Sequence, residues 1–445
     1  MERDAVVSAF FGKYGFMMPD SNSVIQALLY DMQQSLDNGR RESAMGAKQA
    51  MIPTWCNFSD KEIKKESVIV IDAGGTNFRT CLVTFDHAAQ PVVSDFRKMS
   101  MPGIQKELSK EEFFDTIAHQ LDYLKNKSKK IGFCFSYAME ITPDRDGKVL
   151  GFSKEIKASA VIGSQVGASL KAALKKTGWE DGLSVTLLND TTAALLAGKG
   201  QPTPGVRFSS YIGFILGTGL NIAYIESGPI RKIDGIKDSF GNAAPASQIV
   251  VCESCMFDKI PLSEFDRILD DNSCAPGEFT LEKMCSGAYI GPLAVIAVRQ
   301  ACTDCLFSAE FAAAFKISGD FVLADMDRFL YTPFDTTSKL GKLAAAGKPR
   351  DYEILYQIFD SIIERAAVLS SAVIAAAVIK SGQGFDGCSP VCILCNGTTF
   401  SRTHNLRRYI ETYLTRMLES SRGLHFVLKT MENDITIGTA LAALT

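Results

Sequence analysis

The fold is decided by Val-Ile-Asp-Ala-Gly-Gly-Thr-Asn-Phe-Arg-Thr at residues 70–80. The apolar run 68–71 predicts a buried strand, and 77–85 predicts a second strand directly after the glycine pair. A strand, a tight glycine turn and a strand form a hairpin, whereas a Walker loop or a dinucleotide-binding fingerprint leads from a strand into a helix. Many such turns only reverse the chain, but glycines also let backbone N–H groups approach phosphate oxygens. The hairpin is therefore a candidate phosphate-binding turn.

A related unit follows later in the chain. Ile-Leu-Gly-Thr-Gly-Leu-Asn at 215–221 again places a glycine turn between an apolar strand and a continuing strand, and Gly217 follows Gly74 by 143 residues. An internal repeat of this kind predicts two similar lobes. We expect the other strands at 130–136, 183–188, 211–216, 221–226 and 392–395, and helices from Ser21 to Gly39 and at 111–123, 163–176, 191–197 and 437–444.

Composition narrows the class of protein. The 445 residues contain 47 Lys and Arg against 50 Asp and Glu, a balance that disfavours a nucleic-acid or anionic-membrane partner. The longest apolar run, 366–379, is too short for a bilayer and predicts a buried helix. The N-terminus lacks a basic segment followed by an apolar core, so we expect no secretory signal and a cytoplasmic location.

The 12 cysteines include three Cys-x-x-Cys pairs, at 252/255, 302/305 and 392/395. The first two pairs are 47 residues apart, farther than the usual spacing of a four-cysteine zinc site. Residues 392 and 395 fall in a predicted strand, where an odd offset places them on opposite faces. We therefore expect buried free thiols in a reducing compartment instead of a zinc site.

Polar residues at strand ends indicate phosphoryl chemistry. Asp72 ends the first strand, where a carboxylate can hold Mg²⁺ directly or through water, opposite phosphates. Arg79 either adds a cation there or is an ordinary surface charge of a strand. Asp190 follows a buried strand, where open α/β sheets place reactive groups, and a carboxylate there can accept the proton of a substrate hydroxyl. Asp190 can also cap the following helix.

The motif at 70–80 resembles the first phosphate motif of the eukaryotic-type hexokinases, usually Leu-Asp-Leu-Gly-Gly-Thr-Asn-Phe-Arg. Other stretches resemble that family in the same order along the chain, and the length suits a single catalytic unit. These stretches are Met-Ile-Pro-Thr at 51–54, Phe-Cys-Phe-Ser at 133–136, Phe-Ser-Lys at 152–154, Leu-Asn-Asp-Thr at 188–191, Gly-Thr-Gly-Leu-Asn at 217–221, Pro-Gly at 276–277, Leu-Glu-Lys-Met at 281–284 and Ser-Gly-Ala-Tyr at 286–289.

The resemblance implies a two-lobed, actin-like (ribonuclease H-like) α/β ATPase fold with a sugar site in the cleft between the lobes. The small lobe would comprise 65–194 plus 434–445, and the large lobe 1–64 plus 195–433. The implied reaction is transfer of phosphate from ATP, with Mg²⁺, to the 6-hydroxyl of a hexose, with glucose the first candidate, by a monomer or homodimer. Two alternatives remain: a catalytically weak hexose and nucleotide sensor, and an actin-like or chaperone-like ATPase.

The resemblance also implies roles for individual residues. Asp190 would be the general base, with Lys154 and Arg79 as further catalytic residues, and Asp72 would hold Mg²⁺ through water. The sugar ligands would be Ser136, Ser153, Lys154, Asn189, Asp190, Asn221, Glu253 and Glu282. The residues facing ATP would be Asp72, Gly74, Gly75, Thr76, Asn77, Arg79, Gly217, Thr218 and Gly219 at the phosphates and Gly397, Thr398 and Thr399 along the adenosine.

Three stretches depart from the family pattern. Phe152-Ser-Lys stands for the usual Trp-Thr-Lys, which keeps a hydroxyl beside the lysine. Glu-Ser-Cys-Met-Phe-Asp at 253–258 stands for Glu-Trp-Gly-Ala-Phe-Gly, so the glutamate is kept and its neighbours are not. Asn-Gly-Thr-Thr-Phe at 396–400 stands for Asp-Gly-Thr-Leu-Tyr. The changes lie beside the sugar and adenosine residues and leave the base and the phosphate turns unchanged.

Overall fold

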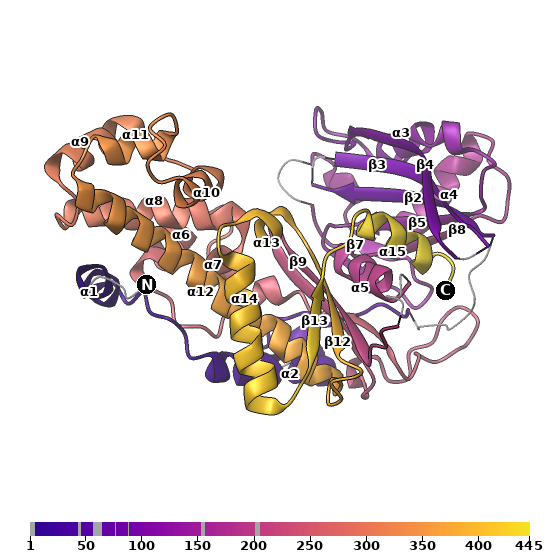
Figure 1. Cartoon of the computed structure of the whole chain (residues 1–445). Coiled ribbons are helices and arrows are strands. Elements are labelled where there is room, and N and C mark those ends of the chain that lie inside the picture. The colour runs from indigo at the N-terminus through magenta and orange to yellow at the C-terminus, as the bar shows by residue number, and fades with distance from the viewer. Residues whose placement is uncertain are drawn as a thin grey trace.

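The two glycine hairpins lie in two separate sheets, one in each of two lobes of the computed structural model (Figure 1). The structure describes residues 5–42, 46–56, 65–75, 77–87, 89–152, 156–200 and 205–445. The small-lobe sheet has the order β4-β3-β2-β5-β8, and the large-lobe sheet has the order β1-β11-β10-β9-β12-β13. The strands are β1 Ile52–Pro53, β2 Ser67–Gly74, β3 Asn77–Phe85, β4 Pro91–Ser100, β5 Lys130–Phe135, β6 Met139–Ile141, β7 Gly147–Val149, β8 Ser184–Leu188, β9 Ser210–Leu216, β10 Leu220–Glu226, β11 Gln248–Val251, β12 Val391–Asn396 and β13 Phe426–Lys429.

The internal repeat predicted from the two turns extends over both sheets. In the small lobe β2 pairs antiparallel with β3 and parallel with β5, and β5 pairs parallel with β8. In the large lobe β9 pairs antiparallel with β10 and parallel with β12, and β12 pairs parallel with β13. The turns themselves differ in length by one residue. In the first hairpin Gly74 pairs with Asn77, which leaves two residues in the turn, and in the second Leu216 pairs with Leu220, which leaves three.

Helices cover the sheets and extend the large lobe. Helices α8 to α11 form a projection at the end of the large lobe that lies away from the small lobe (Figure 1). The helices are α1 Ala5–Lys13, α2 Ser21–Glu42, α3 Lys110–Gln120, α4 Val166–Lys176, α5 Asp190–Gly200, α6 Glu264–Asp271, α7 Thr280–Cys285, α8 Gly287–Thr303, α9 Ala309–Ser318, α10 Leu323–Tyr331, α11 Lys339–Ala345, α12 Pro349–Ser381, α13 Thr398–Arg402, α14 Leu406–Leu414 and α15 Asp434–Ala442, with short 3-10 turns at Asp122–Leu124, Ser159–Val161, Arg231–Ile233 and Ser254–Met256 and a π-helical turn at Thr415–Ser420.

Several helix boundaries differ from the prediction, and those of α2 and α4 have a clear local cause. The Asp20 carboxylate accepts a hydrogen bond from the Ser23 N–H at 2.8 Å, so Asp20 caps α2 and Ser21 is its first residue. The helix then continues past Gly39 to Glu42. The helix expected from Gly163 begins at Val166, because Gly163 has a φ of +86°.

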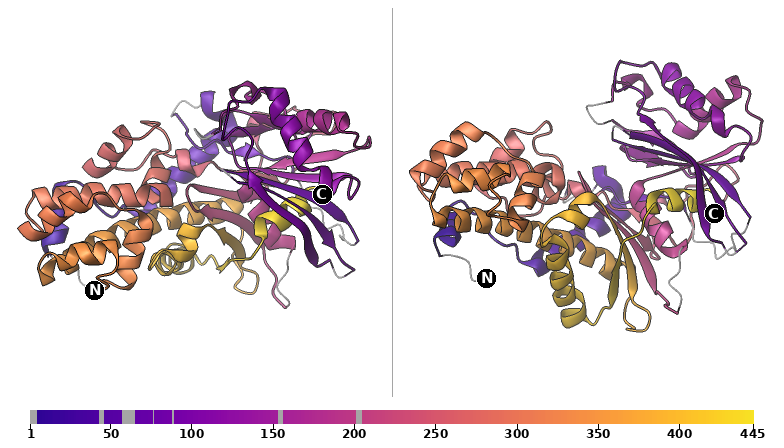
Figure 2. Two further views of the ribbon diagram at one scale, coloured as in Figure 1. Left: turned by 90° about the horizontal axis from the view of Figure 1, so that it is seen from above. Right: turned by 45° about the horizontal axis from the view of Figure 1, so that its top comes forward.

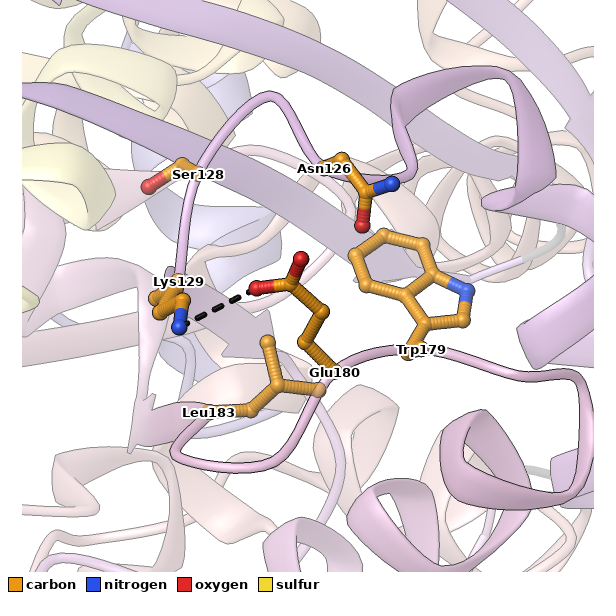
Figure 3. A pocket seen from close by; sticks show the side chains of 6 residues that line it. All are labelled: Asn126, Ser128, Lys129, Trp179, Glu180 and Leu183. Carbon is orange, nitrogen blue, oxygen red and sulfur yellow. Dashed lines mark ion pairs between the residues drawn. The ribbon is translucent and has the colours of Figure 1, made fainter.

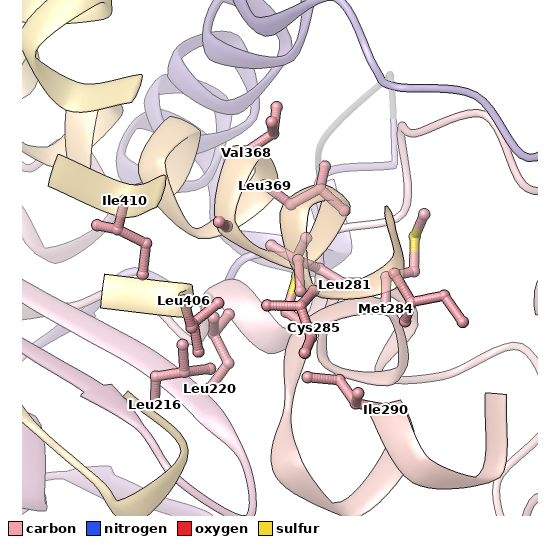
Figure 4. Close-up of a cluster of buried hydrophobic side chains, with 14 of the residues drawn as sticks. Leu216, Leu220, Leu281, Met284, Cys285, Ile290, Val368, Leu369, Leu406 and Ile410 are labelled. Atoms are coloured by element: carbon pink, nitrogen blue, oxygen red, sulfur yellow. The ribbon is translucent and has the colours of Figure 1, made fainter. Parts of the chain in front are cut away.

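The buried helix predicted at 366–379 is part of α12, whose 33 residues run through the large lobe. By length and composition α12 could cross a membrane, but 89% of its most apolar 18-residue window is buried inside the protein. Val368 and Leu369 of α12 belong to the same buried cluster as Leu216 and Leu220, which flank the second glycine turn (Figure 4). The apolar composition of α12 therefore serves the core behind that turn.

Two helices connect the lobes. Helix α15 packs on β2 and β5 of the small lobe, α5 packs on β9 and β12 of the large lobe, and the two helices pack against each other. The turned views show the C-terminal helix beside the small-lobe sheet (Figure 2). A side chain at Gly438 would overlap the carbonyl group of Ala193, so glycine permits this close helix contact. The predicted lobe boundary at residue 194 falls inside α5 and stays a prediction.

The cysteines of the three Cys-x-x-Cys pairs are predicted to be buried, and four of these six residues are. Cys252, Cys255, Cys392 and Cys395 are buried, Cys302 is half-buried, and Cys305 is exposed. The prediction is wrong for Cys305, which lies just after the end of α8.

Candidate active site

Asp190 lies where β8 ends and α5 begins, between the two sheets. The Thr191 N–H donates to Asp190 Oδ1 at 2.8 Å and to Asn189 Oδ1 at 2.9 Å, and the Thr191 hydroxyl also donates to Asn189 Oδ1. Both carboxylate and amide are thus fixed by the first turn of the helix. Asp190 is the first residue of α5, and the Asn189 carbonyl accepts the first helical hydrogen bond, from the Ala193 N–H at 3.1 Å. Asn189 therefore caps the helix, and the prediction that Asp190 does so is wrong.

The electrostatic surroundings of Asp190 come from both lobes. Burial raises the pKa of Asp190 to about 6, and the nearby negative charges of Glu253 and Asp72 contribute to the increase. Hydrogen bonds from the Thr191 N–H and the Ser136 hydroxyl act in the opposite direction. A carboxyl group with this pKa is mostly ionised at neutral pH and still a useful proton acceptor.

The predicted sugar ligands of the large lobe form a second group. Asn221 Nδ2 donates to Glu253 Oε1 at 2.9 Å, and the Glu253 N–H donates back to Asn221 Oδ1 at 3.0 Å. Glu282 Oε2 accepts the Leu220 N–H at 3.0 Å. Burial raises the pKa of Glu282 to about 7, with a further contribution from Glu253. Paired amide and carboxylate groups of this kind are suited to sugar hydroxyls, which both donate and accept hydrogen bonds.

The first glycine turn combines a carboxylate, a guanidinium and a left-handed glycine. Arg79 Nη1 lies 2.7 Å from Asp72 Oδ2. Burial raises the pKa of Asp72, and the Arg79 hydrogen bond and charge oppose that increase. Gly75 has a φ of +57°, and the Tyr137 hydroxyl donates to its carbonyl. A side chain on Gly74 would stand 3.5 Å from Ser136 Oγ. Because the Ser136 hydroxyl also bonds to Asp190, the first turn lies close to Asp190.

The second glycine turn is oriented by hydrogen bonds to its carbonyl groups. The Gly217 carbonyl accepts from the Gly287 N–H at 2.9 Å and from the Thr399 hydroxyl at 2.8 Å. The Thr218 carbonyl accepts from the Ala288 N–H at 3.3 Å. In a trans peptide the N–H points opposite to the carbonyl, so the N–H groups of Thr218 and Gly219 point away from α8. Two N–H groups aimed the same way form an anion-binding concavity, which fits the phosphates of ATP.

The residues predicted to lie along the adenosine, Gly397, Thr398 and Thr399, are close to the second glycine turn. Gly397, with a φ of +118°, and Thr398 begin α13 close to the second turn, since a side chain on Gly217 would stand 3.6 Å from Gly397 Cα. The buried hydroxyl of Thr399 donates to the Gly217 carbonyl, and the predicted place of Thr399 along the nucleotide stays a prediction. Thr399 therefore supports the phosphate turn.

The described residues can be compared with what a bound magnesium ion would need. Among them, no three acidic, histidine or cysteine side chains converge as a metal cage. Mg²⁺ in phosphoryl-transfer sites commonly uses one or two carboxylates, water and substrate phosphates. The buried carboxylate of Asp72, beside the first turn, fits that kind of coordination.

Several predicted residues stay untested by the geometry. Thr76, Ser153 and Lys154 lie outside the described residues. Phe152, the last described residue before Ser153, packs against Tyr137 with ring centroids 5.2 Å apart. Asn77 pairs with Gly74 at the start of β3, as its place in the hairpin predicts.

Sequence reasoning missed two polar groups at the site. Tyr137 bonds to the first turn, and its only sequence signal is its place after Ser136. Asp434, buried at the start of α15, accepts both hydrogen bonds of the Asn396 amide at 2.7 and 2.8 Å. Burial raises the pKa of Asp434, and the charge of Asp72 adds to the effect, which places Asp434 near the first phosphate turn.

A separate cavity of about 110 Å³ lies in the small lobe (Figure 3). Trp179, Asn126 and Leu183 line it, together with the ion pair of Lys129 and Glu180 at 3.1 Å. It is smaller than ordinary ligand pockets of roughly 300–1,000 Å³. None of the predicted site residues lines it, so we assign it no part in the chemistry.

The chain is similar to known proteins over nearly its whole length. One hexokinase family model matches residues 15–199 and a second matches residues 211–445. Hexokinase-7 of Oryza sativa subsp. japonica is 27% identical over 424 residues, which cover 89% of this chain and 88% of that protein. Hexokinase-5 of the same organism is 28% identical over 472 residues, covering 99% and 90%. The structure of a Schistosoma mansoni hexokinase complexed with glucose has a TM-score of 0.75 at 22% identity, covering 99% of this chain and all of that one. The predicted two-lobed fold is thereby confirmed.

Proposed function

Because the chain belongs to the hexokinase family of sugar-phosphorylating phosphotransferases, we propose that it transfers the γ-phosphoryl group of ATP to the 6-hydroxyl of a hexose. Glucose is the first candidate, since a protein of the same fold is described in complex with glucose. The observation that supports this proposal most is the placement of Asp190 beside the first glycine turn, near enough to Glu253 for that charge to raise the pKa of Asp190, while Glu282 lies against the second turn.

In this reaction Asp190 is the general base. The 6-hydroxyl gives its proton to the Asp190 carboxylate while its oxygen bonds to the γ-phosphorus, and the bond from that phosphorus to the β,γ-bridging oxygen breaks to release ADP. Asn221, Glu253 and Glu282 orient the other hydroxyls, and the N–H groups of the two turns hold the phosphates. Mg²⁺, held through Asp72, would neutralise phosphate charge when bound.

A coupled assay tests the proposal with glucose, mannose, fructose and glucosamine, each with ATP and Mg²⁺. We expect hexose 6-phosphate and ADP in equal amounts from at least one sugar. Asp190→Asn should lower kcat by roughly 10²–10⁴-fold while hexose binding persists. Asp20→Asn is the matched control, because Asp20 also begins a helix but lies outside the site. Near-normal turnover of folded Asp190→Asn would remove Asp190 from this role, and the absence of product from all four sugars would refute hexose phosphorylation.

A further inference from the structure

Glu253 has an unusual backbone conformation for a sugar ligand. Its φ of +54° and ψ of +47° lie in the left-handed region, which non-glycine residues adopt only where the surroundings hold them there. The conformation directs the chain out of β11 and into the 3-10 turn Ser254–Met256. Something in the structure must therefore keep Glu253 in place.

The residues on either side of Glu253 are both held by one segment from the N-terminal part of the chain. The Cys252 carbonyl accepts the Met51 N–H at 3.2 Å. The Ser254 hydroxyl donates to Gln49 Oε1 at 2.8 Å, across 205 positions of sequence. Gln49 is fully buried and Ser254 is 1% exposed, so water does not replace this hydrogen bond. The Gln49 side chain is thus the partner that fixes the start of the 3-10 turn.

Gln49 is itself held in place by hydrogen bonds to α2. Its Nε2 donates to Asp31 Oδ1 and to the Leu28 carbonyl, both at 3.3 Å, and its own N–H donates to Asp31 Oδ1 at 2.9 Å. Asp31 is fully buried, and Lys259 Nζ lies 2.6 Å from its Oδ2. The amide of Gln49 is therefore satisfied on both its oxygen and its nitrogen, which fixes its orientation.

We propose that Gln49 is a positioning residue for hexose binding: through Ser254 it holds Glu253 in the left-handed conformation that keeps the Glu253 carboxylate beside Asn221 and Asp190. The proposal rests on the proposed function, in which Glu253 binds the sugar. The resembled family motif carries Trp where this chain has Ser254, so the hydroxyl that bonds to Gln49 is not part of that motif.

The test compares Gln49→Met, which keeps the length of the side chain without its hydrogen bonds, with Ser254→Ala and with the double variant. Each single variant should raise the hexose KM roughly 5- to 30-fold, the effect of one buried hydrogen bond, with the ATP KM unchanged. The double variant should raise the hexose KM no more than Gln49→Met alone, because Ser254→Ala removes a hydrogen bond that Gln49→Met has already removed. Ser371→Ala is the matched control: its buried hydroxyl bonds to the Ala367 carbonyl inside α12, and the variant should lose stability without a change in hexose KM.

Three outcomes overturn the proposal in distinguishable ways. Glu253→Gln should raise the hexose KM; if it does and folded Gln49→Met and Ser254→Ala do not, the positioning role is wrong while the proposed function stands. If Glu253→Gln leaves the hexose KM unchanged, the sugar-binding role of Glu253 is wrong and the positioning role falls with it. Equal increases in the KM of hexose and of ATP would show a general structural defect and also overturn it. Should Gln49→Met fail to fold, the smaller change Ser254→Ala still decides the matter.

Discussion

Replacing the proposed base should make the protein more stable while it lowers kcat. Burial and nearby negative charges raise the pKa of Asp190 from its ordinary 3.8 to about 6. Because each tenfold change in proton affinity corresponds to about 1.4 kcal/mol, keeping Asp190 charged in the folded protein costs about 3 kcal/mol at pH 8. Asp190→Asn removes the charge and keeps an oxygen for the Thr191 N–H. We therefore expect the variant to gain up to about 3 kcal/mol in free energy of unfolding at pH 8.

The sign and the pH window follow from proton linkage. A carboxyl group whose pKa is raised by folding binds its proton more tightly in the folded state, so it lowers stability as pH rises from about 4 to about 6. The advantage of Asp190→Asn should accordingly shrink to about half its pH 8 value at pH 5, where the wild-type carboxyl is already mostly protonated in the folded protein.

Urea unfolding of both proteins between pH 5 and pH 8.5 measures this difference directly. Asp335→Asn is the control, and its effect on stability should have the opposite sign. Hydrogen bonds from Thr337 and Arg328 lower the pKa of Asp335 to about 2, so removing this carboxylate should destabilise the protein at pH 8. An Asp190→Asn variant less stable than the wild type at pH 8, or an advantage that does not change with pH, would refute the electrostatic account of the site.

Further measurements address other features. The kcat/KM for hexose should fall as pH drops below about 6, because the base then carries its proton, and a profile flat from pH 8 to pH 5 would contradict this. Gly219→Ala would place a Cβ 2.5 Å from Glu282 Oε2 and should raise the hexose KM; Gly75→Ala has open space but a φ of +57°, and should cost about 1–2 kcal/mol of stability, which urea unfolding can check. Saturating hexose should reduce the radius of gyration in X-ray scattering, and ATP alone should do so much less, because the sugar ligands come from both lobes. Metal analysis of protein purified without chelator should find well under one zinc per chain, and a stoichiometric content would overturn the free-thiol interpretation of the cysteine pairs.

Local sequence pattern predicted the hairpins well. The strand expected at 77–85 is β3 with the same bounds, and the glycine repeat extends to matching strand orders in both sheets. These features depend on alternating and continuous apolar runs and on turn chemistry, which neighbouring residues alone determine. The family resemblance added the side chains of the site, whose roles stay predictions; the structure pairs Asn221 with Glu253, and the Glu253 charge acts on Asp190.

The features that sequence reasoning missed depend on contacts between distant segments. A glycine turn suggests a positive φ at both Gly75 and Gly219, but of the two only Gly75 has one; Gly219 is glycine because Glu282 occupies the space beside it. Thr399 faces the Gly217 carbonyl because two loops 182 residues apart in the sequence pack together. Asp434 comes near Asp72 only when α15 packs on the small lobe. No local pattern contains these contacts, because each needs the finished tertiary structure.

The packing of α15 on β2 and β5 has a consequence for synthesis on the ribosome. The small-lobe sheet is complete once β8 has left the exit tunnel, yet the helix that covers it begins 246 residues later in the chain. At translation rates of 5–20 residues per second, synthesis of these residues takes roughly 12 to 50 s. During that time the apolar face of the sheet that α15 later covers stays exposed. Nascent chains stalled in this interval should bind chaperones at β2 and β5, and release of α15 should end that binding.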